Sequence, residues 1–214
     1  MKDLGDYRKS YDKNQLLEND LPQNPLDLFQ KWFAEVESCG GVDEVNAMSV
    51  STIGFDGFPK TRVVLLKQIL ANGFLFYTNY DSEKGRAILS NPKICLSFFW
   101  PNLERQVIVK GIATKVSDKI SDDYFASRPI GSQLGAIVSQ QSSVVASREI
   151  LEKKLTALEL EFGDKKPVRP SNWGGFLVQG IVFEFWQGRP NRLHDRIRFS
   201  DFDGSLWNIN RLAP

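Results

Sequence analysis

The chain has 214 residues, 42% of them hydrophobic, so it is long enough to bury a substantial core. Its 27 Lys and Arg residues balance 26 Asp and Glu residues, and the formal net charge of +1 excludes a global field that would attract nucleic acid or an anionic membrane. The charged N-terminus has no apolar signal region, no later apolar run approaches the roughly 20 residues of a membrane span, and the cysteines lack metal-site spacing. We therefore expect a cytoplasmic protein without nucleic-acid partner, membrane or metal.

The N-terminal half is predicted to form a flexible arm, a helix and an antiparallel meander. Residues 1–24 are polar and make up the arm, and Asn24 with the neighbouring prolines suits the entry of the helix. From Ala47, runs of β-branched and aromatic residues alternate with glycine-containing turns, which is typical of successive strands. Asp81 or Ser82 is expected to cap a further short helix. The predicted elements are, in order, the helix Leu26–Glu37, strands over 47–53, 61–70 and 74–79, and the helix over 83–90.

The C-terminal half is predicted to contain further strands and two helices. Apolar residues recur on one stripe of the longer helix, which we interpret as a packing surface, and Gly163 ends that helix. The stripe consists of Leu151, Leu155, Leu158 and Phe162. The predicted elements are, in order, strands over 93–100 and 104–117, a helix from its cap Ser117 to about Ser127, the helix Arg148–Phe162, a strand over 176–187, and a hairpin around Asp203 and Gly204.

These elements favour a mainly β fold with peripheral helices. Six or more strands without regular β-α alternation indicate an antiparallel barrel rather than a doubly wound sheet, and we expect a single domain over residues 25–214. The large aromatic side chains are expected in the core or at the rim of the barrel rather than as platforms for ring stacking. These are Trp32, Trp100, Trp173 and Trp186.

The motifs that bind nucleotides and metals are missing from the sequence. It contains no G-x-G-x-x-G after a strand, no G-x-x-x-x-G-K-[ST] and no H-x-x-x-H pair. With one histidine and no cysteine beside it, a multi-histidine metal centre or a Cys-His nucleophile is nearly excluded. Difficult chemistry in this protein would therefore belong to an organic cofactor.

The lone histidine lies in "RLHDR", where Arg192, His194 and Arg196 are two residues apart. An extended backbone would direct all three side chains to one face, which could hold an anion or an electron-rich ring. The alternative is an exposed charged strand in which Asp195 offsets an arginine.

Two more clusters suggest anion binding. In "YFASRPIGSQ", Tyr124 and Arg128 share a helix face and Ser132 follows the break at Pro129, so that the three side chains suit a phosphate ester. A surface Tyr-Arg pair is the alternative. In "KTRVVLLKQ", Arg62 and Lys67 are five residues apart and face opposite sides of a regular strand, so they serve two ligands, or one ligand across a bulge, or simply end the strand as cations.

Taken together, nine stretches resemble the pyridoxine (pyridoxamine) 5'-phosphate oxidase family. They occur in the expected order from about Arg8 to Pro214 and cover nearly the whole chain. The stretches are "TRVVLLK", "FYTN", "NLERQV", "YFASRP", "SQLGAIVSQQSS", "NWGGF", "EFWQG", "RLHDR" and "INRLAP".

The resemblance implies an antiparallel Greek-key split β-barrel that binds FMN in a homodimer, with each flavin site drawing on both chains. One subunit would hold FMN through Arg62, Val63, Val64, Leu65, Tyr77, Thr78, Ser82 and Lys84. The other subunit would contribute Gln106, Gln141, Ser142, Trp186 and Arg196.

The resemblance also implies the substrate and the reaction. The substrate's 5'-phosphate would lie among Lys67, Tyr124, Arg128 and Ser132, its pyridine ring would contact the catalytic pair Arg192 and His194, and Arg8 and Tyr11 would belong to an N-terminal lid. The family reaction oxidises C4' of pyridoxine 5'-phosphate or pyridoxamine 5'-phosphate to give pyridoxal 5'-phosphate, with FMN as hydride acceptor and O2 as the oxidant that yields H2O2. Arg62 and Lys67 would then serve different ligands.

One residue departs from the family pattern. Where many members have Ser-Arg-Lys, this chain has "SEK", so Glu83 replaces an arginine expected near the FMN phosphate. Since a carboxylate beside a dianion is repulsive, we predict that Glu83 turns outward, that Lys84, Arg62 and the helix N-terminus hold the phosphate, and that FMN binds more weakly than is usual. Two alternatives stay open, a flavin split-barrel oxidoreductase for another heterocycle and a non-catalytic carrier of FMN or pyridoxal phosphate.

Overall fold

The computed structural model describes residues 2–163 and 165–214, in which nine strands join in one sheet. The hydrogen-bonding order is β2-β1-β5-β6-β7-β4-β3, with β8 beside β7 and β9 beside β8, and the β3–β4, β4–β7, β7–β8 and β8–β9 pairs are antiparallel. The strands are β1 Ala47–Ile53, β2 Pro59–Leu65, β3 Gln68–Leu70, β4 Gly73–Asn79, β5 Lys93–Trp100, β6 Arg105–Lys115, β7 Trp173–Gln187, β8 Asp195–Ser200 and β9 Asn208–Arg211. The mainly β, antiparallel fold expected from the sequence is confirmed.

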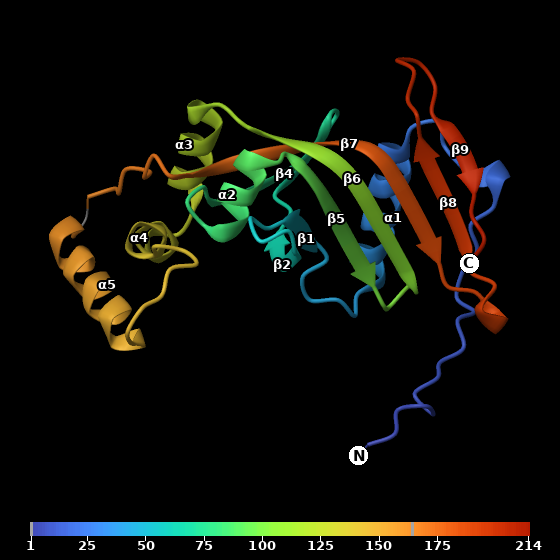
Figure 1. The fold of residues 1–214 in the computed structure, drawn as a ribbon, viewed down its shortest axis with the longest axis horizontal. Coiled ribbons are helices and arrows are strands. Elements are labelled where there is room, and N and C mark those ends of the chain that lie inside the picture. The colour runs from blue at the N-terminus through green and yellow to red at the C-terminus, as the bar shows by residue number, and fades with distance from the viewer. Residues whose placement is uncertain (1, 164) are drawn as a thin grey trace. The chain divides into compact units, whose positions relative to one another are not determined.

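Five α-helices accompany the sheet in the described residues (Figure 1). They are α1 Pro25–Cys39, α2 Glu83–Ser90, α3 Asp118–Ser127, α4 Ile130–Val138 and α5 Arg148–Phe162, and short 3-10 turns occur at Glu18–Asp20 and Pro190–Arg192. None of the helices in the described part of the chain is long and apolar enough to cross a membrane.

Contacts divide the chain into two compact units, which are described separately. Unit 1 comprises Met1–Val50, Cys95–Gly111 and Gly180–Pro214, and unit 2 comprises Ser51–Ile94 and Ile112–Gln179. The single domain expected over residues 25–214 stays a prediction.

Unit 1 has an aromatic core built on α1. Asn24 caps this helix by accepting a hydrogen bond from the Leu26 N–H, and Pro25 occupies the first helical position, where a missing N–H costs nothing. The buried face of α1 places Phe29 4.9 Å from Phe98 and Trp32 5.3 Å from Phe185, between ring centroids. Trp32 and Trp100 are buried here, as the sequence predicts, and Trp186 is half-buried.

In unit 2, glycines on β7 allow aromatic side chains to approach the strand closely. The β4–β7 register pairs Tyr77 with Gly175. A Cβ at Gly175 would lie 2.9 Å from the Tyr77 ring, and one at Gly174 would lie 2.2 Å from the Tyr80 hydroxyl. Larger residues at either position would displace these rings, so the "WGG" sequence fixes where Tyr77 lies.

The helix predictions are confirmed closely, with one omission. The predicted caps Ser82 and Ser117 accept hydrogen bonds from the N–H groups of Gly85 and Ile120, and α5 has the predicted bounds. No described residue of α5 is buried, so its apolar stripe is only half-covered where the helix lies beside α4 (Figure 1). The sequence analysis did not foresee α4, and Ser132 lies in its first turn rather than in a loop.

Two strand predictions were wrong. The strand expected over 61–70 is two strands, β2 and β3, because the chain breaks between Leu65 and Gln68. The alternation expected for Arg192, His194 and Arg196 also fails, because a 3-10 turn begins at Pro190, and Asn191 and Arg192 have positive φ angles of 57° and 61°. Only Arg196 of the three lies in a strand, so the shared face predicted for them does not exist.

Candidate active site

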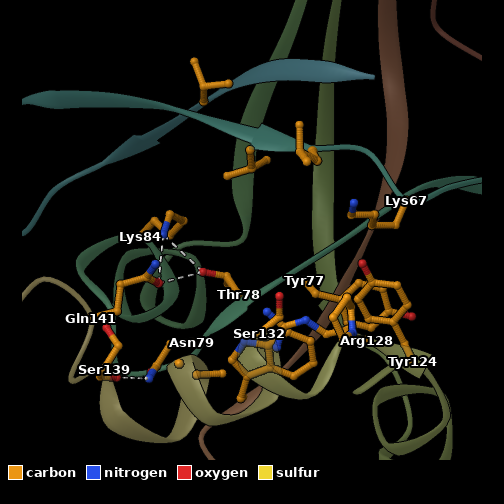
Figure 2. A pocket seen from close by; sticks show the side chains of 17 residues that line it. Lys67, Tyr77, Thr78, Asn79, Lys84, Tyr124, Arg128, Ser132, Ser139 and Gln141 are labelled. Carbon is orange, nitrogen blue, oxygen red and sulfur yellow. Dashed lines mark hydrogen bonds between the residues drawn. The ribbon is translucent and has the colours of Figure 1, made fainter. Parts of the chain in front are cut away.

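Unit 2 contains a cavity of about 680 Å³ that collects most of the predicted site residues of that unit (Figure 2). The broken strand β2–β3 forms one wall, β4 and β7 contribute aromatic and hydroxyl groups, and the helices α2, α3 and α4 contribute cations and polar groups. The predicted residues that line the cavity are Val63, Val64, Leu65, Lys67, Tyr77, Thr78, Lys84, Tyr124, Arg128, Ser132 and Gln141.

A buried lysine lies at one end of the cavity. The Lys84 ammonium group donates hydrogen bonds to Thr78 Oγ1 and Gln141 Oε1, each 3.1 Å away, and the side chain belongs to a residue that is 6% exposed. Burial first, and the positive charge of Arg62 second, lower the pKa of Lys84 to about 8. Because its two hydrogen-bond acceptors are neutral, this cation can receive an anionic ligand.

The other end of the cavity combines an aromatic stack with an arginine. The Tyr77 and Tyr124 rings stack with centroids 3.8 Å apart, and the Arg128 guanidinium lies 4.7 Å from the centroid of the Trp173 ring. Burial lowers the pKa of Arg128, and its buried Nη1 has no hydrogen-bond partner among the described residues. Figure 2 shows Arg128 in the same part of the cavity as Lys67, Tyr124 and Ser132, apart from the group around Lys84.

Two aromatic residues of the stack, Tyr77 and Trp173, have surroundings that affect their roles in the cavity. Burial first, and the neighbouring Tyr124 second, raise the pKa of Tyr77 to about 12, so its phenol stays neutral at physiological pH. Trp173 is buried, as expected, but it also stacks with Tyr77 at 5.6 Å and lines the cavity, so the contrast drawn from the sequence between core residue and stacking platform fails for this tryptophan.

Glu83 is held by cations rather than directed into the cavity. Its carboxylate accepts hydrogen bonds from the Lys60 ammonium group and from Arg62 Nη2, the latter at 2.9 Å, and Lys60 is the main cause of a lowered pKa of Glu83. Neither Glu83 nor Arg62 lines the cavity, while Arg62 Nη1 is buried without a hydrogen-bond partner among the residues described. Lys60 was not among the predicted site residues, although its spacing from Arg62 on β2 puts both side chains on one face.

The remaining predicted residues of this region have other surroundings. Ser82 Oγ accepts from the Gly85 N–H and donates to the Asn79 carbonyl, so it serves the helix cap. Ser142 is exposed. Gln141 Oε1 accepts hydrogen bonds from Thr78 Oγ1 and from the Lys84 ammonium group of the same chain, and its approach to FMN from the other subunit stays a prediction. Asn79, which the sequence analysis overlooked, also lines the cavity.

Unit 1 contains a second group around the lone histidine. The His194 ring lies 4.8 Å from Trp186 and 5.7 Å from Tyr11, between centroids. Nδ1 of His194 accepts a hydrogen bond from the Arg189 N–H, and burial followed by the charge of Arg192 lowers the pKa of His194. The imidazole is therefore held in the neutral form with its proton on Nε2, which leaves Nε2 as a donor.

The other predicted residues of unit 1 are not drawn into that group by any described hydrogen bond. Arg196 donates from Nε and Nη2 to Glu184 Oε1 at 2.9 and 2.7 Å, and Arg192 and Arg8 are exposed. Gln106 is a half-buried residue of β6. Across residues 2–163 and 165–214, no cluster of three or more His, Cys, Asp or Glu side chains could hold a metal ion.

The donors of the unit 2 cavity fit two phosphate groups. Lys84 lacks an anionic hydrogen-bond partner, and the buried Nη1 of Arg128 has no hydrogen-bond partner, in the part of the chain that is described. Such desolvated cations are costly unless an anion completes them. The phosphate of FMN at the Lys84 end and a phosphorylated substrate at the Arg128 end would satisfy this requirement.

Comparisons with known proteins identify a family for both parts of the chain. The family model described as pyridoxamine 5'-phosphate oxidase matches residues 37–161, and the model of the pyridoxine 5'-phosphate oxidase C-terminal dimerisation region matches residues 173–214. A pyridoxine/pyridoxamine 5'-phosphate oxidase of Flavobacterium psychrophilum is 63% identical over 214 residues, which is 100% of both chains.

Two solved structures resemble the fold. PhzG from Burkholderia lata, in complex with tetrahydrophenazine-1-carboxylic acid, has a TM-score of 0.87 and 26% identity, covering 96% of this chain and 100% of its own. A pyridoxamine 5'-phosphate oxidase-related, FMN binding protein of Nostoc punctiforme has a TM-score of 0.69 and 15% identity, covering 88% and 96%.

Proposed function

The chain belongs to the pyridoxamine 5'-phosphate oxidase family and is an FMN-dependent oxidoreductase, and from this premise we propose which substrates and oxidant it uses. It oxidises pyridoxine 5'-phosphate and pyridoxamine 5'-phosphate to pyridoxal 5'-phosphate, with O2 as the acceptor and H2O2 as a product. With the amine substrate, water hydrolyses the imine that forms and ammonia is released. The proposal includes a homodimer, which the match to a dimerisation region supports, and a cytoplasmic location, which stays a prediction from the sequence.

The observation that carries the proposal is the phosphate-binding character of the cavity at Arg128. The guanidinium of this half-buried residue lies over the Trp173 ring, its buried Nη1 has no hydrogen-bond partner among the described residues, and Lys67, Tyr124 and Ser132 line the same cavity. A guanidinium binds two phosphate oxygens at once, and the ammonium and hydroxyl groups can bind the remaining oxygen atoms. A substrate that carries a phosphate ester would therefore be fixed at one end of its ring.

The residues of the chain bind and orient in this reaction. Lys84, Thr78 and Gln141 would hold FMN, which when bound takes the hydride from C4' of the substrate and passes the electrons to oxygen. His194 is neutral with Nε2 as a hydrogen-bond donor, which suits contact with an oxygen atom on the pyridine ring. Arg192 supplies a positive charge beside it. Holding the substrate by its phosphate and its ring would orient C4', which is the main contribution expected from the protein.

Mixing the FMN-loaded protein anaerobically with pyridoxine 5'-phosphate and then admitting air tests the proposal. We expect the flavin absorbance to bleach and then to recover, with pyridoxal 5'-phosphate and H2O2 formed. A flavin band that never bleaches would exclude this substrate, and bound flavin without oxygen uptake would favour the carrier alternative.

A second candidate is oxidation of another heterocycle, which the similarity to PhzG favours. PhzG is described in complex with a tetrahydrophenazine carboxylic acid, a tricyclic compound without a phosphate. If this chain acted on such a ring, that acid would bleach the flavin and pyridoxine 5'-phosphate would not. The cations around Arg128 argue for the phosphorylated substrate, since a carboxylate needs fewer donors.

A further inference from the structure

The N-terminal arm is fastened to unit 1 through its backbone. The N–H groups of Asp12 and Lys13 both donate to Glu104 Oε2, at 3.0 and 3.2 Å, and the Lys9 ammonium group lies 3.4 Å from Glu104 Oε1. One carboxylate that lies 91 residues or more from these donors in the sequence thus binds three points of the arm. Two of these three contacts use backbone N–H groups, which every non-proline residue carries, so the sequence of the arm gave no signal of them.

Glu104 itself is unusually constrained. It is 1% exposed and has a φ angle of 57°, a conformation that non-glycine residues keep only where the surroundings enforce it. Its carbonyl accepts hydrogen bonds from the Gly188 N–H at 2.8 Å and from the Gln187 side chain. The Glu104 backbone is therefore fixed beside the end of β7, the strand that precedes the turn before His194.

The fastened segment places Tyr11 against the group around the histidine. The Tyr11 ring meets the Trp186 ring edge-on, with centroids 5.7 Å apart, and meets the His194 ring at the same distance. Gly188 leaves the space that this requires, because a Cβ there would lie 2.8 Å from Tyr11. The backbone bonds at residues 12 and 13 directly follow Tyr11, so they determine where its ring lies.

We propose that Glu104 is a positioning residue that holds the arm so that the Tyr11 ring stays against His194, the residue proposed to contact the substrate's ring. Glu104 is not proposed to touch the substrate. It acts through the hydrogen bonds that its carboxylate accepts from the N–H groups of Asp12 and Lys13. The effect on substrate binding rests on the proposed function, whereas the fastening of the arm does not. Two hydrogen bonds to a buried charge are strong enough to keep the arm closed most of the time.

Limited digestion with trypsin tests the fastening without any substrate. In the FMN-loaded protein, Glu104→Gln should speed cleavage after Lys9 and Lys13 by about tenfold, since a neutral amide is a weaker acceptor and loses the ion pair. Glu37→Gln, which alters an exposed carboxylate of α1, is the matched control and should leave the rate unchanged. Equal cleavage of Glu104→Gln and wild type would overturn the proposal, whatever the enzyme's activity.

Steady-state kinetics then separates a positioning role from a general structural one. Glu104→Gln should raise the KM for pyridoxine 5'-phosphate about tenfold and change kcat less, and Glu104→Asp, which keeps the charge, should lie in between. Deleting residues 2–13 should raise KM at least as much, and adding Glu104→Gln to that deletion should have no further effect. Multiplying effects would show that Glu104 acts independently of the arm and would contradict the proposal. If the Gln variant does not fold, the Asp variant and its combination with the deletion give the same test.

Discussion

The cations at the C-terminal strands of unit 1 and those that line the cavity of unit 2 differ in how their charges are balanced. At the C-terminal strands of unit 1, Arg196 pairs with Glu184, and Arg211 pairs with Glu18 and Asp195. In the cavity of unit 2, Lys84 and Arg128 form no ion pair among the described residues, although Lys84 is buried and Arg128 is half-buried. Paired arginines complete a structure, whereas buried cations without a carboxylate indicate a missing anion, so the comparison distinguishes binding residues from structural ones.

Arg128 gives the strongest test of the difference between unpaired and paired cations. We expect Arg128→Ala to lower kcat/KM for pyridoxine 5'-phosphate about a hundredfold, because two charged hydrogen bonds to phosphate are lost. The melting temperature of the apoprotein should not fall, since a desolvated charge is removed. Arg211→Ala is the contrasting variant and should lower the melting temperature by about 2 °C while leaving KM unchanged. The opposite pattern would show that the pairing of charges does not separate the two roles.

A second prediction concerns Arg192 and His194, which lie in the region of paired charges. Arg192→Ala and His194→Ala should each lower kcat about tenfold, because a ring held only by its phosphate reacts from fewer productive orientations. Flavin reduction measured by stopped flow checks this. Unchanged turnover in both variants would show that neither Arg192 nor His194 takes part in the reaction.

The third prediction uses the lowered pKa of Lys84. The charged ammonium binds phosphate, and its pKa of about 8 lies below the ordinary value of 10.5, so FMN binding to the apoprotein should weaken up to about tenfold per pH unit above pH 8. Quenching of FMN fluorescence during titration measures the dissociation constant. Lys84→Met should bind FMN weakly at every pH and remove the dependence, and a dependence that persists in this variant would assign it to another group.

The lowered pKa of Lys84 also affects the stability of the apoprotein, which should increase with pH where FMN binding weakens. Between about pH 8 and pH 10.5 the unfolded chain binds a proton at Lys84 that the folded apoprotein does not, so the free energy of unfolding should rise with pH across this window. Urea titrations of the apoprotein at pH 8 and pH 10 compare the two states, with Lys84→Met as the control.

The smallest effect is expected at Glu83, a carboxylate that does not line the cavity of unit 2. It neutralises Lys60 and Arg62, and Glu83→Arg or Glu83→Gln should free both cations and tighten FMN binding about three- to tenfold. Asp56→Asn is the matched control, because Asp56 also pairs with Lys60, at 3.1 Å, but lies in the turn between β1 and β2. Binding of FMN no tighter than in wild type would show that Glu83 does not weaken the site.

Local sequence patterns were sufficient for many elements. Strands β1 and β5 and helix α5 have the predicted bounds, because alternation, helical periodicity and terminating residues act over a few neighbours. The break at Leu66 and Lys67 was not predictable in this way, since Lys67 leaves the strand to donate its N–H to the Leu75 carbonyl on β4. The turn at Asn191 and Arg192 was missed because positive φ angles at non-glycine residues have no strong sequence signal.

The candidate site was predictable only in its residue types and family motifs. Tyr124 and Arg128 line the same cavity, although Arg128 is the extended C-cap residue of α3 and the two do not share a helix face as predicted. The contacts of Lys60 with Glu83 and of Glu104 with the arm join residues that are 23 and 91 or more positions apart, and no local pattern records such pairs. Which cations have a carboxylate partner and which lack one depends on such distant contacts, so it was not predictable from the sequence.

The most direct test of the phosphate site compares anaerobic flavin reduction by pyridoxine 5'-phosphate and by unphosphorylated pyridoxine, in wild type and in Arg128→Ala. If Arg128 and its neighbours bind the phosphate, removing the phosphate or the guanidinium should each slow reduction at low substrate concentration by about a hundredfold. Removing both should slow it little further. Equal rates for the two substrates in wild type, or losses that multiply in the double comparison, would contradict a phosphate-binding role for this cavity.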